Sequence, residues 1–191
     1  MLYLASQSPR RQELLAQLTP IFRILPSHIN EDVRPNEQAR DYVNRMAIEK
    51  AEACLQQVNE QGAWVLGSDT IVVSHGNILG KPENQDHFIA MMSSLQGATH
   101  QVMTAIALIS NEHCFTQTVV TDVTFRRLSR AEMLAYWQTG EPEDKAGGYG
   151  IQGIAGKFVK KINGSYSSVV GLPLYETEQL LIKANLGMDG V

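Results

Sequence analysis

The chain has 191 residues, of which 43% are hydrophobic and 19% are charged, and its formal net charge is −4. These values are typical of a globular protein of one domain or two tightly joined lobes, and the acidic balance argues against a general nucleic-acid binder. No apolar run approaches the ~20 residues that span a bilayer, and polar residues interrupt the N-terminus too early for a signal peptide, so we expect a cytoplasmic protein without a membrane partner.

The first eleven residues predict a strand, a turn and the start of a helix. Residues 2–5 form a short apolar run, and Ser8 followed by Pro9 is a favourable helix start. Arg10 and Arg11 then lie in the first helical turn, where cations oppose the helix dipole. Free backbone N–H groups and added guanidinium groups together form a place to hold a phosphate. Two solvated arginines on a surface helix are the alternative interpretation.

Predicted strands and helices alternate along the rest of the chain. A strand near 22–25 precedes a long helix over about 37–58, and the most apolar segment, 64–73, predicts a buried strand that returns through a hairpin at His75-Gly76-Asn77. The later elements are expected in this order: a helix over 87–95, strands over 101–109 and 116–128, a helix from Ser129 to near Gly140, strand pieces at 159–162 and 169–170, and a last helix from Pro173 to near Gly187. This alternation predicts an α/β fold with a mixed sheet.

Two charged residues lie where the local pattern is apolar. Asp69 lies inside the most apolar strand, where an ionised carboxylate needs a partner or a metal, so we interpret it as functional. An aspartate that caps a neighbouring turn is the alternative. Lys50 projects along the apolar stripe of the long helix, either as a phosphate ligand or as a lysine whose stem covers apolar surface.

Three further charged residues could form a site together with Asp69. The predicted hairpin brings Lys81 back toward Asp69, where the lysine could form a simple ion pair or hold a phosphate whose metal the aspartate binds. Glu31 and Asp32 lie in a loop and could be no more than solvated charges. Two converging carboxylates are, however, what a divalent cation needs, so this loop is a candidate second source of metal ligands.

A glycine-rich stretch over 147–153 would let the backbone approach a ligand closely, although such a loop is weak evidence by itself. It lacks the ending and spacing of a P-loop. Gln152 offers both a donor and an acceptor, as recognition of a base edge requires. Cys54 and Cys114 are predicted to be reduced packing residues, and no Cys/His or Ser/His/Asp nucleophile arrangement is found. The whole set of residues suits metal-assisted hydrolysis of a nucleotide phosphate.

Several motifs follow one another with consistent spacing over nearly the whole chain: LASQSPRRQELL, the loop with Glu31, the segment Glu49-Lys50-Ala51, GSDTIV, GKP, GGYGIQGIAG and INGSYSSVVGLP. In this order they resemble the Maf family of nucleoside triphosphate pyrophosphatases. The resemblance implies a single Maf-type domain over residues 1–191, with two lobes around a central cleft. It implies an elongated α/β fold with a mixed twisted sheet and flanking helices, similar to that of inosine-triphosphate pyrophosphatase.

The resemblance also implies an activity and the residues that perform it. The enzyme would cleave a nucleoside triphosphate between the α- and β-phosphates with a divalent cation such as Mg²⁺ or Mn²⁺, and it would form a homodimer. Carried over residue by residue, the substrate-binding positions are Ser8, Arg11, Lys50 and Lys81, the metal-binding positions are Glu31 and Asp69, and the catalytic positions are Asp69, Glu31 and Lys81. Asp69 would accept the proton of the attacking water.

Three positions assign the chain to a branch of this family. A sister branch that prefers 7-methyl-GTP has tryptophan at Arg10, glutamine at Thr70 and glutamate at Gln152. The resemblance therefore implies a preference for dTTP and UTP, with modified pyrimidine nucleotides as further candidates. Gln152 can complement the mixed donor–acceptor edge of thymine or uracil, whereas a glutamate suits guanine. The alternatives are a 7-methyl-GTP-type preference and a non-catalytic nucleotide sensor that regulates cell division.

Overall fold

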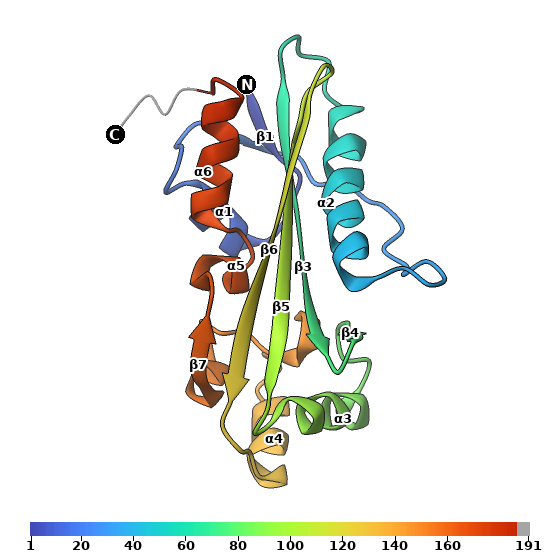
Figure 1. The fold of residues 1–191 in the computed structure, drawn as a ribbon, viewed down its shortest axis with the longest axis vertical. Coiled ribbons are helices and arrows are strands. Elements are labelled where there is room, and N and C mark those ends of the chain that lie inside the picture. The colour runs from blue at the N-terminus through green and yellow to red at the C-terminus, as the bar shows by residue number, and fades with distance from the viewer. Residues whose placement is uncertain (187–191) are drawn as a thin grey trace. The chain divides into compact units, whose positions relative to one another are not determined.

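The computed structural model describes residues 1–186 and contains a seven-stranded mixed sheet with the strand order β2-β1-β3-β5-β6-β7, in which β4 pairs with β3 (Figure 1). The strands are β1 (Leu2–Leu4), β2 (Arg23–Ile24), β3 (Trp64–Ser74), β4 (Asn77–Leu79), β5 (Thr99–Ile109), β6 (Cys114–Phe125) and β7 (Val159–Asn163). Strand β1 is parallel to β2 and β3, whereas the β3–β4 and β6–β7 pairs are antiparallel. The predicted mixed α/β fold is confirmed.

The helices are α1 (Pro9–Leu15), α2 (Ala39–Leu55), α3 (Gln85–Leu95), α4 (Arg130–Trp137), α5 (Tyr166–Val170) and α6 (Leu174–Lys183), with 3-10 turns η1 (Ala146–Gly148) and η2 (Ile154–Phe158). Gly187, near which the last helix is expected to end, lies outside the described residues, and α6 ends at Lys183. Among the described residues, no helix has both the length and the apolarity that crossing a membrane requires.

The described elements form two compact units. The first unit comprises Met1–Asp69, Thr104–Val119 and the chain from Gly171 onward, and the second comprises Thr70–Met103 and Val120–Val170. The long strands β3, β5 and β6 each contribute residues to both units, because the division falls within them.

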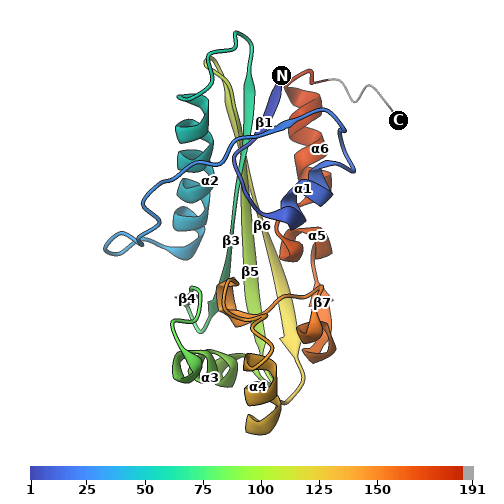
Figure 2. The ribbon, with the colours of Figure 1, turned by 180° about the vertical axis from the view of Figure 1, so that it is seen from behind.

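In the first unit, α2 lies on one side of the strands and α1 and α6 lie on the other (Figures 1 and 2). Helix α2 buries an apolar face that includes Met46 and Ala47. It approaches β3 so closely at Gly67 that a Cβ built there would overlap the carbonyl oxygen of Ala47 and lie 2.9 Å from Cβ of Ala51. The absence of a side chain at Gly67 therefore sets how near α2, and with it Lys50, lies to β3.

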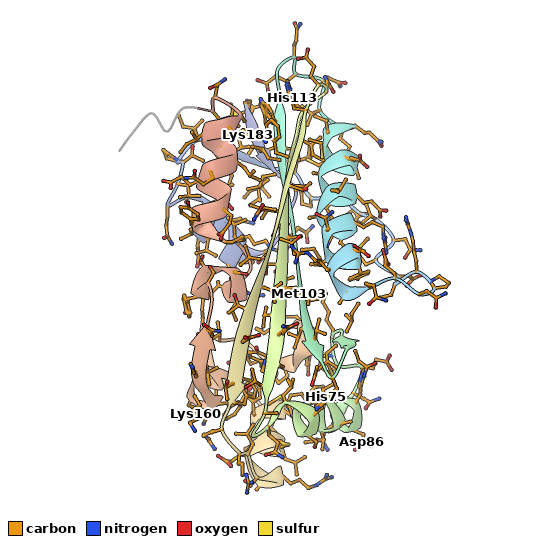
Figure 3. The ribbon with its side chains drawn as sticks, in the orientation of Figure 1. His75, Asp86, Met103, His113, Lys160 and Lys183 are labelled. Carbon is orange, nitrogen blue, oxygen red and sulfur yellow. The ribbon has the colours of Figure 1, made fainter. Side chains whose placement is uncertain are left out.

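In the second unit, β3 and β4 are joined by the two-residue turn His75-Gly76, which Figure 3 locates by its labelled histidine. Both residues have positive φ, 50° and 79°, as a type I′ hairpin requires, and the predicted hairpin is confirmed. The predicted capping box at the start of α4 is also present, between Ser129 and Glu132. A core of aromatic and aliphatic side chains includes residues of α3 and α4, among them Phe88 and Tyr136, together with Phe158 of η2.

Two local predictions are wrong. Residues Val169 and Val170 lie in α5 and not in a strand, because Ser165 caps a short helix there: its Oγ accepts from the backbone N–H of Ser168 at 3.2 Å. This local cap overrides the strand preference of the two valines. Both cysteines are free and Cys54 is buried, but Cys114 is exposed at the start of β6 and does not pack in the core.

Candidate functional site

An ion-paired cluster of one lysine and two carboxylates is the clearest polar feature of the first unit. Asp69 is only 7% exposed on β3, and its Oδ1 accepts from Nζ of Lys50 at 2.7 Å. The same ammonium lies 3.0 Å from Oε1 of Glu31. Helix α2, strand β3 and the loop before α2 thus bring together three of the predicted site residues, and the partner that a buried carboxylate needs is Lys50.

The two carboxylates also fit a divalent cation. Because Glu31 and Asp69 both contact one ammonium group, their oxygens converge on a single position for positive charge. Mg²⁺ is commonly held by one or two carboxylates together with substrate phosphates and water, which matches this donor set. Within the part of the chain that the structure describes, no group of three or more His, Cys, Asp or Glu residues could hold a metal by itself.

The loop that carries Glu31 is fastened to α2 by contacts that were not predicted from the sequence. The hydroxyl of Tyr42 donates to the backbone carbonyl of Glu31 at 2.8 Å. The guanidinium of Arg45 donates to Glu37 at 2.6 and 2.7 Å and to the carbonyl of Asp32 at 3.0 Å. Burial raises the pKa of Tyr42 to about 12, which keeps its hydroxyl protonated as a donor. The sequence signal for this arrangement is faint, since one tyrosine and one arginine three residues apart are common on surface helices.

Arg11 lies near the same cluster at the beginning of α1. Its Nε donates to the carbonyl oxygen of Gly171 at 2.8 Å, and its Nη1 donates to Oγ of Ser6 at 3.4 Å. Burial lowers the pKa of Arg11, whereas the charges of Asp69 and Glu31 raise it, so these carboxylates lie close enough to act on the guanidinium. Arginine nevertheless remains charged, because its ordinary pKa is far above neutrality. The first unit therefore joins two cations and two anions in one polar region.

The other two predicted residues of α1 have different surroundings. Ser8 caps the helix, with its Oγ accepting from the backbone N–H of Arg11 at 3.5 Å, a long contact. Arg10 is half-buried and its positive charge lowers the pKa of Arg11. The predicted N-terminal cap is confirmed, and Arg10 and Arg11 both lie in the first turn of α1 as expected.

The remaining predicted residues belong to the second unit. Thr70 is half-buried on β3, and Lys81 is exposed after β4. Gln152 is exposed in a turn that the Gly153 N–H closes by donating to the carbonyl of Gly150 at 3.1 Å. The expected approach of Lys81 to Asp69 stays a prediction, because the two residues belong to different units.

Comparison with known proteins gives a consistent result over nearly the whole chain. A family model described as Maf-like protein matches residues 1–184. A protein of Colwellia psychrerythraea named dTTP/UTP pyrophosphatase is 58% identical, with 99% of this chain and 90% of that protein covered. A protein of the same name from Pseudoalteromonas atlantica is 52% identical over 99% of this chain and 100% of its own length. A Shigella flexneri protein named nucleoside triphosphate pyrophosphatase is 53% identical, with 96% and 93% covered.

Among solved structures, the Ham1 protein of Staphylococcus aureus matches with a TM-score of 0.47 and 12% identity over 65% of this chain and 71% of that one. This similarity is too low to support an argument about the present fold.

Proposed function

The chain belongs to the Maf family, and we propose that it hydrolyses dTTP and UTP to the corresponding monophosphate and pyrophosphate. Relatives that are 52–58% identical and named dTTP/UTP pyrophosphatase support this substrate choice. The structural observation that supports it best is the contact of one lysine, Lys50, with two carboxylates, Asp69 and Glu31. Such a cluster offers a proton acceptor, a phosphate ligand and metal ligands within one small region.

In the proposed reaction, the cationic side chains neutralise the triphosphate. Arg11, whose Nε donates to a backbone carbonyl and whose Nη1 donates to Ser6, contributes the positive charge of its guanidinium, and Lys50 and Lys81 add two ammonium groups. Ser8 shapes the beginning of α1, where free backbone N–H groups favour an anion. These groups stabilise the negative charge that moves onto the leaving pyrophosphate.

Asp69 accepts a proton from the water that attacks the α-phosphorus. The water oxygen forms the new bond to phosphorus, the bond to the bridging oxygen breaks, and pyrophosphate leaves with the electron pair. Glu31 and Asp69 would hold a divalent cation, Mg²⁺ or Mn²⁺, which when bound polarises phosphate oxygens as a Lewis acid. The near-complete burial of Asp69 suits a base, because it limits the water that competes for the carboxylate.

Selection of the base is assigned to Arg10, Thr70 and Gln152. The amide of Gln152 presents one donor group and one acceptor atom, which matches the adjacent carbonyl and N–H of thymine or uracil. Guanine carries an exocyclic amino donor beside its N1–H, and the amide of Gln152 would leave this second donor without an acceptor. Such mismatches are costly when the site is built to hydrogen-bond its ligand.

A panel of nucleoside triphosphates, assayed for pyrophosphate release with Mn²⁺, tests the proposal. The panel contains dTTP, UTP, CTP, modified pyrimidine nucleotides, the purine nucleotides and 7-methyl-GTP. We expect kcat/KM to be highest for dTTP and UTP. Highest activity on 7-methyl-GTP would overturn the substrate assignment, and no release from any nucleotide would favour a non-catalytic sensor.

Three further features stay predictions from the family resemblance. They are a single Maf-type domain with two lobes around a cleft, a homodimer and a cytoplasmic location. Sedimentation of the purified protein tests the homodimer directly.

A further inference from the structure

The turn that carries Gln152 is tied to one pair of side chains in the second unit. The hydroxyl of Tyr136, on α4, accepts from the backbone N–H of Gly150 at 3.3 Å, at the beginning of the turn. The same hydroxyl donates to Oε1 of Glu141 at 2.8 Å. The second carboxylate oxygen of Glu141 accepts from the backbone N–H of Ile154 at 2.9 Å, just after the turn. Both ends of the turn are therefore anchored on a hydrogen-bonded tyrosine and glutamate.

Close packing reinforces these hydrogen bonds. A Cβ built at Gly153 would overlap the carboxylate of Glu141, so the carboxylate lies directly against the backbone of the turn. A Cβ at Gly150 would lie 2.8 Å from Cε of Lys145. The ammonium of Lys145 in turn donates to the backbone carbonyl of Glu141 at 2.7 Å. An added Cβ at either glycine would displace the ends of the Glu141 and Lys145 side chains from these contacts.

The tyrosine of this anchor is buried and closely packed. Tyr136 is only 2% exposed, and its ring packs against Phe158 with the ring centroids 5.2 Å apart. Burial raises the pKa of the Tyr136 hydroxyl, so the hydroxyl stays protonated and continues to donate to Glu141. A glycine-rich turn without such support would sample many conformations, and binding would have to order them at a cost in free energy.

We propose that Tyr136 and Glu141 are positioning residues for base selection: they hold the turn over 150–153 in one conformation, so that the exposed amide of Gln152 meets the base edge already oriented. This inference rests on the proposed function, in which Gln152 recognises the base. Neither residue needs to touch the substrate, because preorganisation of a recognition group improves selectivity by reducing the cost of ordering it. Disordering the turn should therefore affect nucleotides with a matching base more than ligands that have no base.

The test compares Tyr136→Phe and Glu141→Gln with the wild type in two measurements. The first is the ratio of kcat/KM for dTTP to that for dGTP, and the second is inhibition by inorganic tripolyphosphate, which carries no base. We expect each variant to lower the ratio by about tenfold, the effect of one lost hydrogen bond to a charged group, mainly through KM. Inhibition by tripolyphosphate should stay within about twofold of the wild type, because the phosphate ligands are untouched.

Glu132→Gln is the matched control, because Glu132 is a hydrogen-bonded glutamate on the same helix that contacts Ser129 and Arg126 and not the turn. The ratio of kcat/KM for dTTP to that for dGTP should be the same in Glu132→Gln as in the wild type. Tyr136→Phe keeps the buried ring, and thermal unfolding of each variant shows that it is folded when it is assayed. An unchanged ratio in both test variants, an equal fall in the control, or a parallel loss of tripolyphosphate inhibition would overturn the inference.

Gln152→Glu separates this inference from the proposed function. If Gln152→Glu changes the ratio and the two anchor variants do not, the positioning role is wrong and the proposed function stands. If the wild type fails to hydrolyse dTTP, or Gln152→Glu leaves the ratio unchanged, the proposed base recognition is wrong and the positioning role is wrong with it.

Discussion

The ammonium of Lys50 on α2 lies 2.7 Å from Oδ1 of Asp69 on β3. This contact explains how the most apolar strand of the chain contains an aspartate that is only 7% exposed, because the carboxylate has a charged donor. It also joins the helix to the strand at the point where the proposed chemistry occurs. The pair therefore serves the fold and, in the proposed mechanism, the reaction.

Replacing the proposed proton acceptor tests that mechanism. Asp69→Asn keeps the size of the side chain but removes its ability to accept a proton, and we expect kcat for dTTP to fall by about 10²–10⁴, the usual contribution of a general base. Steady-state assays with circular dichroism as a check on folding measure the effect. Near wild-type turnover by a folded Asp69→Asn protein would show that another group accepts the proton.

Two adjacent acidic residues of one loop should respond differently to neutralisation. The side chain of Glu31 contacts Lys50 at 3.0 Å, whereas Asp32 is held through its backbone carbonyl by Arg45. We expect Glu31→Gln to raise the Mn²⁺ concentration needed for half-maximal activity about tenfold or more, since it removes one of two charged ligands. Asp32→Asn is the matched control and should leave the Mn²⁺ dependence unchanged. Equal effects of the two substitutions would remove Glu31 from the proposed metal site.

The three residues proposed to select the base can be replaced together by those of the branch that prefers 7-methyl-GTP. A variant with Arg10→Trp, Thr70→Gln and Gln152→Glu should lose activity on dTTP and gain activity on 7-methyl-GTP, because tryptophan can stack on a cationic base and glutamate accepts from a guanine edge. The ratio of kcat/KM for the two nucleotides measures the change. A ratio equal to that of the wild type would mean that other residues select the base.

The close approach of α2 to β3 predicts a sharp difference between two glycines. Gly67→Ala would force Cβ against the backbone of α2, and such overpacking costs about 1–3 kcal/mol of unfolding free energy. Gly80→Ala is the control, because a Cβ there meets no atom within 4 Å, and it should change stability by about 0.5 kcal/mol or less. Urea denaturation of both variants checks the prediction. Equal stability would show that the α2–β3 packing adjusts without cost.

The acid stability of the first unit should depend on Glu37. Hydrogen bonds from Arg45 lower the pKa of this carboxyl from its ordinary value of 4.5 to about 2. Because the folded state binds the proton more weakly than the unfolded chain, the contribution is complete above pH 4.5 and is lost as the pH falls toward 2. The difference in unfolding free energy between the wild type and Glu37→Gln should therefore shrink over that range. A difference in unfolding free energy that stays constant with pH would contradict this ion pair. The control is Glu83→Gln, which replaces an exposed glutamate.

Much of the fold could be predicted from local sequence patterns. The apolar strand over 64–73, the hairpin at His75-Gly76-Asn77 and the capping box at Ser129 each carry a short-range signal that the structure confirms. The strand expected at Val169 and Val170 is wrong, because β-branched residues carry only a weak preference and the cap by Ser165 decides the conformation.

Part of the candidate site could also be predicted from local sequence patterns. The sequence indicates that Asp69 needs a partner and that Lys50 lies along an apolar helix stripe, but it predicts Lys81 and not Lys50 as the lysine near Asp69. The structure pairs Asp69 with Lys50. The contacts of Tyr136 with Glu141 and Gly150 join residues whose types are common on any surface. Such contacts depend on the packing of α4 against the glycine-rich stretch, which no sequence period encodes.

Hydrolysis of dTTP in ¹⁸O-labelled water, followed by mass spectrometry of the products, tests the central claim most directly. If water attacks the α-phosphorus, one ¹⁸O atom appears in dTMP and the pyrophosphate is unlabelled. Label in pyrophosphate, or formation of dTDP and inorganic phosphate, would contradict the account.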